Sequence, residues 1–207
     1  EKSGFTDFGK ITEIPLEYMT LRQSAKTCGI SISEGKLHIQ GGNSLASKYN
    51  QGLLARRHQH HSYDFTAKME FTPGDYCHMA GIVCYYNYDN NYYLHMSVDD
   101  EGKTYVMLNV SVNKEITQSE KVYLQENGKP AYLKAEVREC DVTFFVSQDG
   151  ISYTQVGDVL DMRNLSDERV DGNGFTGAMV GVSCQDLHGD GVQADFDWLD
   201  YKVFKPL

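Results

Sequence analysis

The histidines at positions 58, 60 and 61 are the first residues of this chain that could do chemistry. On a strand, alternation would place His58 and His60 on one face and Gln59 and His61 on the other. Two imidazoles with this spacing could bind a metal ion if a neighbouring strand supplied a third ligand. A polar strand face that carries histidines is the simpler interpretation, and the pattern favours it.

Arg56 and Arg57 immediately precede these histidines and would also point to opposite faces of the strand. One arginine would then face a sheet surface where sugar hydroxyls or a carboxylate could dock. The other is expected to pair with an acid.

Acidic residues alternate with apolar ones near the other end of the chain. Strand alternation would place Asp195, Asp197 and Leu199 on one face, with Phe196 and Trp198 on the other. Carboxylates in this pattern could bind calcium if carbonyl groups of a nearby loop completed six or more oxygen ligands. Asp195 and Asp197 are therefore the candidate metal ligands and calcium the candidate ion, the alternative being a solvent-facing edge.

Most other acidic residues fall in turns, where a carboxylate usually caps the backbone or is solvated. They are Asp99, Asp100, Glu101, Asp149, Asp167, Glu168, Asp171 and Asp190. The spacing therefore identifies no pair of carboxylates that could act on either side of a glycosidic bond. The sequence also contains no phosphate-loop, dinucleotide-binding, zinc-protease or serine-hydrolase motif. We expect no catalytic residues, and no glycosidase activity, from this chain alone.

The elements that must position these side chains are short strands. Apolar runs separated by turn residues predict a β-sandwich. The run 80–86 is continuous, which is typical of a strand buried on both faces, whereas 63–71 alternates. No window has a sustained helical period, and 161–168 fits a single helical turn at most. The other predicted strands are 37–39, 92–98, 105–112, 132–138, 142–147, 179–185 and 194–203.

Composition limits the class of protein. The chain has 207 residues, 41% hydrophobic and 23% charged, so a single globular domain over 1–207 is expected. The net charge of −10 makes a nucleic acid a poor partner. No run of 18 apolar residues occurs, so we expect no membrane span, and the polar first residues suggest no leader. Five cysteines without a CxxC pair are expected to be buried free thiols, which weakly favours a reducing compartment.

Several segments, in order, resemble a known family. They are Gly-Gly-Asn-Ser-Leu-Ala-Ser at 41–47, then 51–60, 79–87, 92–95, 174–181 and Ala-Asp-Phe-Asp-Trp at 194–198. Over about residues 20–201 the chain resembles the concanavalin A-like C-terminal domain of family 43 glycoside hydrolases, of the β-xylosidase and arabinofuranosidase type. One difference is that Tyr18 stands where the family usually has a tryptophan.

The resemblance implies a jelly-roll sandwich of two antiparallel sheets that serves as an accessory domain in xylan degradation. In such enzymes a five-bladed β-propeller precedes this domain, carries the catalytic acids of an inverting hydrolase and packs against the sandwich. A loop of the sandwich contributes a phenylalanine near the xylose subsite, and the matching position here is Phe175. The implied partners are this catalytic domain and a xylo- or arabino-oligosaccharide, in the bacterial cytoplasm or periplasm.

Two other functions stay open from the sequence. A free-standing carbohydrate-binding module would use the concave sheet, with a polar and aromatic surface made of Arg57, Gln59, His61, Tyr86 and His95. These residues could equally be buried at the propeller interface or within the sandwich. A stand-alone hydrolase with its own carboxylate pair is the third possibility. The pocket-shaping role of Phe175 also has an alternative, in which the ring folds back onto the edge of the sandwich.

Overall fold

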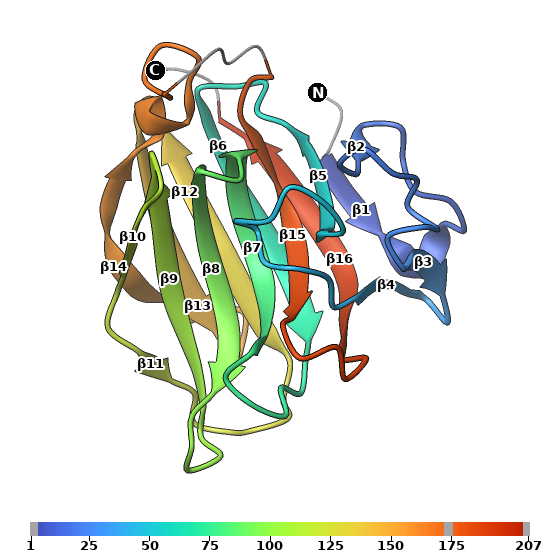
Figure 1. Ribbon diagram of the computed structural model, residues 1–207. Coiled ribbons are helices and arrows are strands. Elements are labelled where there is room, and N and C mark those ends of the chain that lie inside the picture. Colours follow the sequence, from blue (N-terminus) through green and yellow to red (C-terminus); the bar gives the residue numbers. More distant parts are fainter. Residues whose placement is uncertain (1–3, 172–175, 205–207) are drawn as a thin grey trace.

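The computed structural model describes residues 4–171 and 176–204, and these form an all-β sandwich (Figure 1). Two antiparallel sheets of eight strands each pack face to face, as the sequence predicted. The strand order is not sequential, so strands distant in the chain lie side by side. No helix in the described ranges is long and apolar enough to cross a membrane.

One sheet, called sheet A here, has the order β14-β13-β12-β6-β16-β4-β3, with β1 paired to β16. Its strands are β1 (Gly4–Asp7), β3 (Ile30–Ser33), β4 (Lys36–Gln40), β6 (Ser62–Glu70), β12 (Ala131–Arg138), β13 (Asp141–Ser147), β14 (Thr154–Asp161) and β16 (Gln193–Val203).

The second sheet, sheet B, has the order β10-β9-β8-β7-β15-β5-β2, with β11 paired to β9. Its strands are β2 (Tyr18–Met19), β5 (Gly52–Arg57), β7 (His78–Asn87), β8 (Asn90–Val98), β9 (Thr104–Val112), β10 (Glu115–Gln118), β11 (Val122–Tyr123) and β15 (Met179–Asp186). Two short 3₁₀ helices, η1 (Phe8–Lys10) and η2 (Met162–Leu165), join strands; η2 is the single turn predicted near 161–168.

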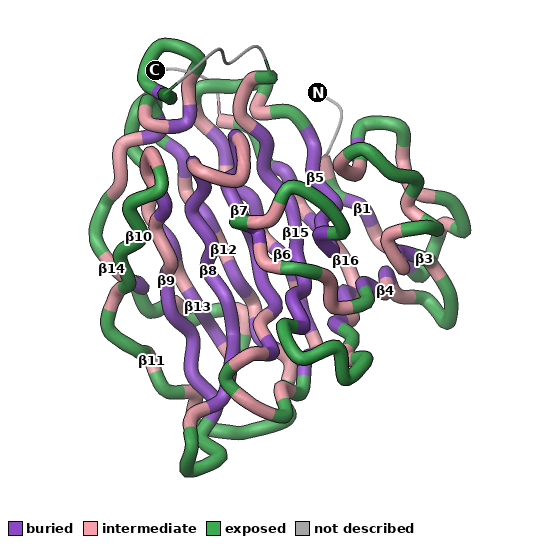
Figure 2. Tube along the Cα trace, viewed as in Figure 1, coloured by how far each residue is buried: buried purple, intermediate pink, exposed green. Residues whose placement is uncertain are grey.

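The core between the sheets follows from strand alternation. Every second side chain of β6, from Tyr63 to Met69, is buried against sheet B. Strands β7, β8 and β15 are buried on both faces, which confirms the prediction for 80–86 (Figure 2). A second apolar cluster on the outer face of sheet B, to which the loop residue Leu45 belongs, explains this burial.

The predicted alternation of 195–199 is wrong, because β16 contains a bulge at Asp197. Its pairing with β6 skips this residue, so that Phe196 and Trp198 face consecutive partners. Phe196 and Leu199 therefore both enter the core. Trp198 turns outward, where its ring lies 5.5 Å from that of Phe5. One extra residue in a strand reverses the faces of all that follow it.

The cysteines follow the prediction only in part. All five are free, and Cys84 and Cys184 are buried, with burial raising the pKa of the Cys84 thiol to about 12. Cys140 is exposed, contrary to expectation. It lies in the tight β12–β13 turn, where the backbone bends away from the core.

The loops gather at two ends of the sandwich (Figure 1). The upper end, at the top of Figure 1, carries the connections 58–61 and 139–140 and the described residues between η2 and β15, which are 166–171 and 176–178. The lower end carries 71–77, 99–103 and 187–192. The side chains most able to bind a ligand or take part in chemistry lie at these two ends.

Candidate functional site

The histidine segment is a loop at the upper end and not a strand. Pairing of β5 with β15 ends at Arg57, and the backbone N–H of His58 donates to the Ala178 carbonyl. The strand faces predicted for 58–61 are therefore wrong. The Nδ1 atom of His58 lies 3.1 Å from the Tyr63 hydroxyl, and that of His60 lies 3.3 Å from the Tyr201 hydroxyl. Among the described residues, the side-chain groups close enough to share a metal ion do not include these histidines.

Arg57 ties the end of β5 to the segment that carries Phe175. Its side chain is exposed, and Nη1 donates to the Gly177 carbonyl at 3.2 Å. Phe175 itself lies outside the described residues. Gln59 and His61 are exposed at the same end. Three of the five predicted sugar-surface residues therefore lie together.

Arg56 points in the opposite direction and is only 8% exposed. Its guanidinium carbon lies 4.2 Å from the centre of the Tyr201 ring and 5.8 Å from that of Tyr18. The expected acidic partner is absent: within the described residues no carboxylate forms an ion pair with Arg56. Aromatic faces stabilise the buried charge in place of an acid.

Tyr86 and His95 do not join the exposed residues. Tyr86 faces the core between the sheets, and its hydroxyl donates to the carboxylate of Asp167 at the upper end. His95 lies in the middle of β8 with no exposed surface, and burial lowers its pKa to about 4. The five residues therefore do not form one sugar-binding surface, because the sheet places them on different faces and at different depths.

The upper end contains an open groove of about 450 Å³. His58 and His61 line one side, and Leu165 and Ala178 provide an apolar floor. Glu139, Asp167 and Glu168 also line the groove, but all three are exposed. An open groove with an apolar floor and exposed charged groups around it is suited to contact with another protein surface.

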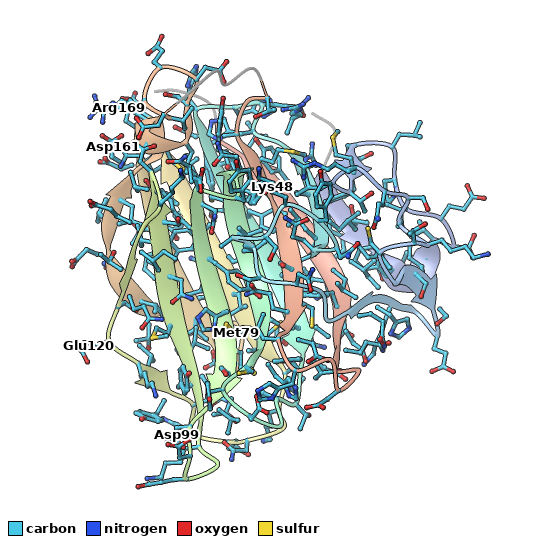
Figure 3. All side chains as sticks on the ribbon, in the orientation of Figure 1. Lys48, Met79, Asp99, Glu120, Asp161 and Arg169 are labelled. Atoms are coloured by element: carbon cyan, nitrogen blue, oxygen red, sulfur yellow. The ribbon has the colours of Figure 1, made fainter. Side chains whose placement is uncertain are left out.

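An ion-pair network fixes the far side of this groove (Figure 3). The carboxylate of Asp161 accepts two hydrogen bonds from Arg163, from Nε at 2.9 Å and Nη2 at 2.8 Å, and one from Arg169 at 3.0 Å. The Arg163 hydrogen bonds lower the pKa of Asp161 to about 2. The network holds η2 and the following turn in one conformation. All three residues lie within positions 161–169, but the sequence analysis did not identify the network.

The predicted calcium ligands lie on the outer face of sheet A with partners of their own. Asp195 is 2.7 Å from Nδ1 of His38, and Asp197 is 2.5 Å from Nζ of Lys68 and 3.6 Å from Nζ of Lys36. A lysine beside a carboxylate occupies part of the space that a cation needs. Calcium binding at these two residues stays a prediction.

Sequence reasoning missed a second group of potential ligands, at the lower end. Asp75, Cys77 and His188 bring one ligand atom each to within 4.8 Å of one another, as do Asp75, His78 and Asp190. Asp190 was interpreted as a solvated turn residue. No local signal could have joined these residues, since two loops more than a hundred positions apart supply them.

Comparison with known proteins gives a consistent result. A family model described as the β-xylosidase C-terminal concanavalin A-like domain matches residues 6–202. A xylan 1,3-β-xylosidase of a Vibrio species is 30% identical over 185 residues, which are 88% of this chain and 35% of that protein. A β-xylosidase of Bacillus subtilis is 30% identical over 177 residues, 83% of this chain and 33% of that protein.

Among solved structures, xylan β-1,4-xylosidase from Bacillus halodurans superposes with a TM-score of 0.93 at 29% identity. The match covers 98% of this chain and 40% of that one. The chain thus spans about a third of the length of the curated relatives it matches. Most of each relative lies outside the region that corresponds to this sandwich.

Proposed function

Because the chain belongs to the family of C-terminal concanavalin A-like domains of β-xylosidases, we propose that it is the accessory domain of a hemicellulose-degrading glycoside hydrolase. The sandwich packs on a catalytic propeller that acts on xylo- or arabino-oligosaccharides, and it helps to shape the sugar pocket. The observation that carries this proposal is the extent of the matches. They include nearly all of this chain, but well under half of each relative, so most of each relative lies outside the sandwich. That remaining length has room for the carboxylate pair that we do not find here.

The position of the N-terminal strand suggests which end meets the catalytic domain. The family description names a C-terminal domain, which supports a catalytic part that precedes it. Strand β1 begins with Gly4 beside Tyr201, at the upper end (Figure 1). A preceding domain would therefore join the sandwich close to the groove.

The character of the upper end fits such a contact. Arg57, Gln59 and His61 are exposed there beside the exposed carboxylates of Glu139 and Asp167. Interfaces between domains of one chain are more polar than a protein core. A surface with charges of both signs around an apolar floor meets this description.

Phe175 is the proposed pocket-shaping residue. Gly177, two positions after Phe175 in the sequence, accepts a hydrogen bond from Arg57 at the upper end. An aromatic ring offers an apolar wall to a pyranose, and an exposed ring often marks a contact surface. The role is to shape the pocket and involves no proton transfer.

The chain alone should not hydrolyse aryl xylosides or arabinofuranosides. The reason is that hydrolysis of a glycosidic bond needs two carboxylates that flank a bound sugar, whereas the carboxylates of this open groove are all exposed. The measurement is release of the aryl group by repurified chain, with the complete enzyme as the positive control. Turnover that disappears when Glu139 or Asp167 is replaced by the amide would contradict the proposal.

Phe175→Ala should lower kcat/KM for xylosides at least tenfold in the enzyme that contains both domains. A tenfold change corresponds to about 1.4 kcal/mol of transition-state binding. The same substitution should change the unfolding free energy of the isolated sandwich by less than about 1 kcal/mol, because a ring that lines another domain's pocket has no core packing to lose there. Tyr123→Ala is the matched control, since this tyrosine is exposed away from the upper end. A large stability loss with intact catalysis would instead place the ring on the sandwich edge.

A further inference from the structure

The cluster of potential metal ligands at the lower end is not part of the groove, and the proposed accessory-domain function does not use it. We propose that Asp75, Cys77, His188 and Asp190 form a binding site for a zinc-like divalent metal ion that links the β6–β7 loop to the β15–β16 loop. This inference is independent of the proposed function, because the cluster lies at the opposite end of the sandwich from the groove (Figure 1).

The side chains already lie close together. Nδ1 of His188 is 2.9 Å from Oδ2 of Asp75 and 4.0 Å from Oδ2 of Asp190. The Cys77 sulfur is within 4.8 Å of the ligand atoms of Asp75 and His188. Asp190 lies in a second set with Asp75 and His78, and the two sets share Asp75. Ligands about 2.0–2.3 Å from a tetrahedral ion lie about 3.3–3.8 Å from one another, so the side chains must rotate to complete the site, and Asp190 must turn towards Cys77.

The carboxylates of the cluster differ from those that a lysine or arginine side chain neutralises. Asp161 and Asp197 are held by arginine or lysine side chains. Asp75 and Asp190 have only histidines as ion-pair partners among residues 4–171 and 176–204. Neighbouring carboxylates without a fixed cation repel one another, and a bound divalent ion would remove this repulsion.

His78 supplies a second, independent observation. The residue is 5% exposed, and its Nδ1 accepts a hydrogen bond from the Gly74 backbone N–H at 3.0 Å. The ring proton of the neutral form must therefore be on Nε2. This atom is buried without a hydrogen-bond partner, 3.4 Å from Oδ2 of Asp190 and 3.5 Å from Oδ1 of Asp186.

An unpaired buried N–H is costly, typically about 1–3 kcal/mol. Asp186 cannot turn towards His78, because both its oxygens accept backbone N–H groups of its own loop. Asp190 is free of such contacts and more exposed. A metal ion that draws one oxygen of Asp190 inward would orient the carboxylate so that it accepts the His78 proton. Hydrogen bonds of this kind commonly orient metal-bound carboxylates.

The donor atoms favour zinc over calcium. One thiolate, one imidazole and two carboxylates are typical zinc ligands, whereas calcium takes six to eight oxygens. Cys77 is half-buried and His188 is exposed, so an ion can reach the site from solvent. With four protein ligands the site is structural, and its effect is to join two loops.

The test uses the 207-residue chain, freed of metal with a chelator that is then removed. Titration with Zn²⁺ in a calorimeter should show one ion per chain. Co²⁺, used as a coloured substitute, should show the thiolate charge-transfer and intense d–d absorption of a tetrahedral cysteine site. Zn²⁺ should also raise the melting temperature, since an ion that binds only the folded state stabilises it.

Cys77→Ser and His188→Ala should each weaken Zn²⁺ binding at least about a hundredfold, because even residues that only orient ligands affect affinity 10–100-fold. Both positions are partly or fully exposed, so these variants should keep the wild-type circular dichroism spectrum. Cys140→Ser, which removes an exposed thiol at the upper end, is the matched control and should bind normally.

Three results would overturn the proposal. They are the absence of heat and of a melting shift with excess Zn²⁺, unchanged binding in the Cys77→Ser and His188→Ala double variant, and loss of the cobalt absorption in Cys140→Ser alone. A Ca²⁺ titration runs in parallel. Stabilisation by Ca²⁺ but not Zn²⁺, abolished in Asp195→Asn, would replace the zinc site by the calcium site predicted from the sequence.

Discussion

Gly81→Ala should destabilise the sandwich by at least about 4 kcal/mol, a loss seen only when a substitution disrupts a specific structural feature. Gly81 lies in β7 between His95 of β8 and Ser183 of β15. A Cβ atom at this position would lie 1.9 Å from the carbonyl oxygen of Leu94 and 2.9 Å from the Cα of His95. Both contacts are with backbone, so no rotamer change can relieve them, and the two central strands must separate.

Urea unfolding measures this effect, with the fluorescence of Trp198, the single tryptophan, as the probe. Because whole-domain stabilities are about 5–15 kcal/mol, the variant should be largely unfolded or insoluble at growth temperature. Gly102→Ala is the control. Its φ is +76° with no atom within 4 Å of an added Cβ, so only the backbone penalty of about 1–2 kcal/mol applies. Equal losses in the two variants would show that the close approach at Gly81 does not matter.

Asp186→Asn should cost about 3 kcal/mol at neutral pH. One oxygen of Asp186 accepts the backbone N–H groups of His188 and Gly189, and the other those of Gly191 and Val192. The asparagine side chain has the same shape, but its NH₂ group would face two of these donors. Hydrogen bonds to a charged group are worth about 1.5–3 kcal/mol each, and buried donors left unpaired add to the loss. Asp158→Asn, at an exposed site, should change stability by less than about 0.5 kcal/mol.

The pH dependence should separate this carboxylate from the other acids. Burial raises the pKa of Asp186, but the N–H groups of Gly191, Gly189 and Val192 more than offset this and lower it to about 2. Since the unfolded value is near 3.9, the stabilisation is fully present above about pH 4 and is lost as pH falls towards 2. The stability gap between the wild type and Asp186→Asn should narrow over this window in chelator-containing buffer. A gap independent of pH would mean that the charge is not what holds the loop.

The two ends of the sandwich thus have different expected roles. Arg57 belongs to the upper end, where the proposed effect, through Phe175, is on catalysis by another domain. Asp186 and the Asp75 cluster belong to the lower end, where the expected effects are on stability and metal binding. Substitutions at the upper end should leave metal binding unchanged, and substitutions at the lower end should leave catalysis by the other domain unchanged.

Local sequence pattern was sufficient to predict the strands with the clearest apolar pattern, but it missed β1, β2, β3, β5, β10, β11 and β14. Apolar alternation in 63–71 and the continuous apolar run 80–86 follow from which faces must be buried, and this depends mainly on neighbouring residues. The resemblance over about residues 20–201 also identified the family, which the match to residues 6–202 confirms.

Other features depended on contacts between distant segments. The bulge at Asp197 exists because β16 must pair with β6 on one side and β4 on the other, and no pattern within 195–199 reveals it. The turn at 58–61 likewise depends on where β15 stops pairing with β5, so polar alternation alone suggested a strand that is not there.

Interactions between side chains of different loops were the least predictable. Asp75 and His188 are 113 positions apart, and they meet only because β7 pairs with β15 and brings the ends of both strands together. A carboxylate in a turn looks solvated from its neighbours in sequence, whereas its charge environment is set by whichever loops the sheet order places beside it. The sequence by itself therefore determined the strands with a clear apolar pattern and the family, and the tertiary structure decided the remaining strands and which polar residues act together.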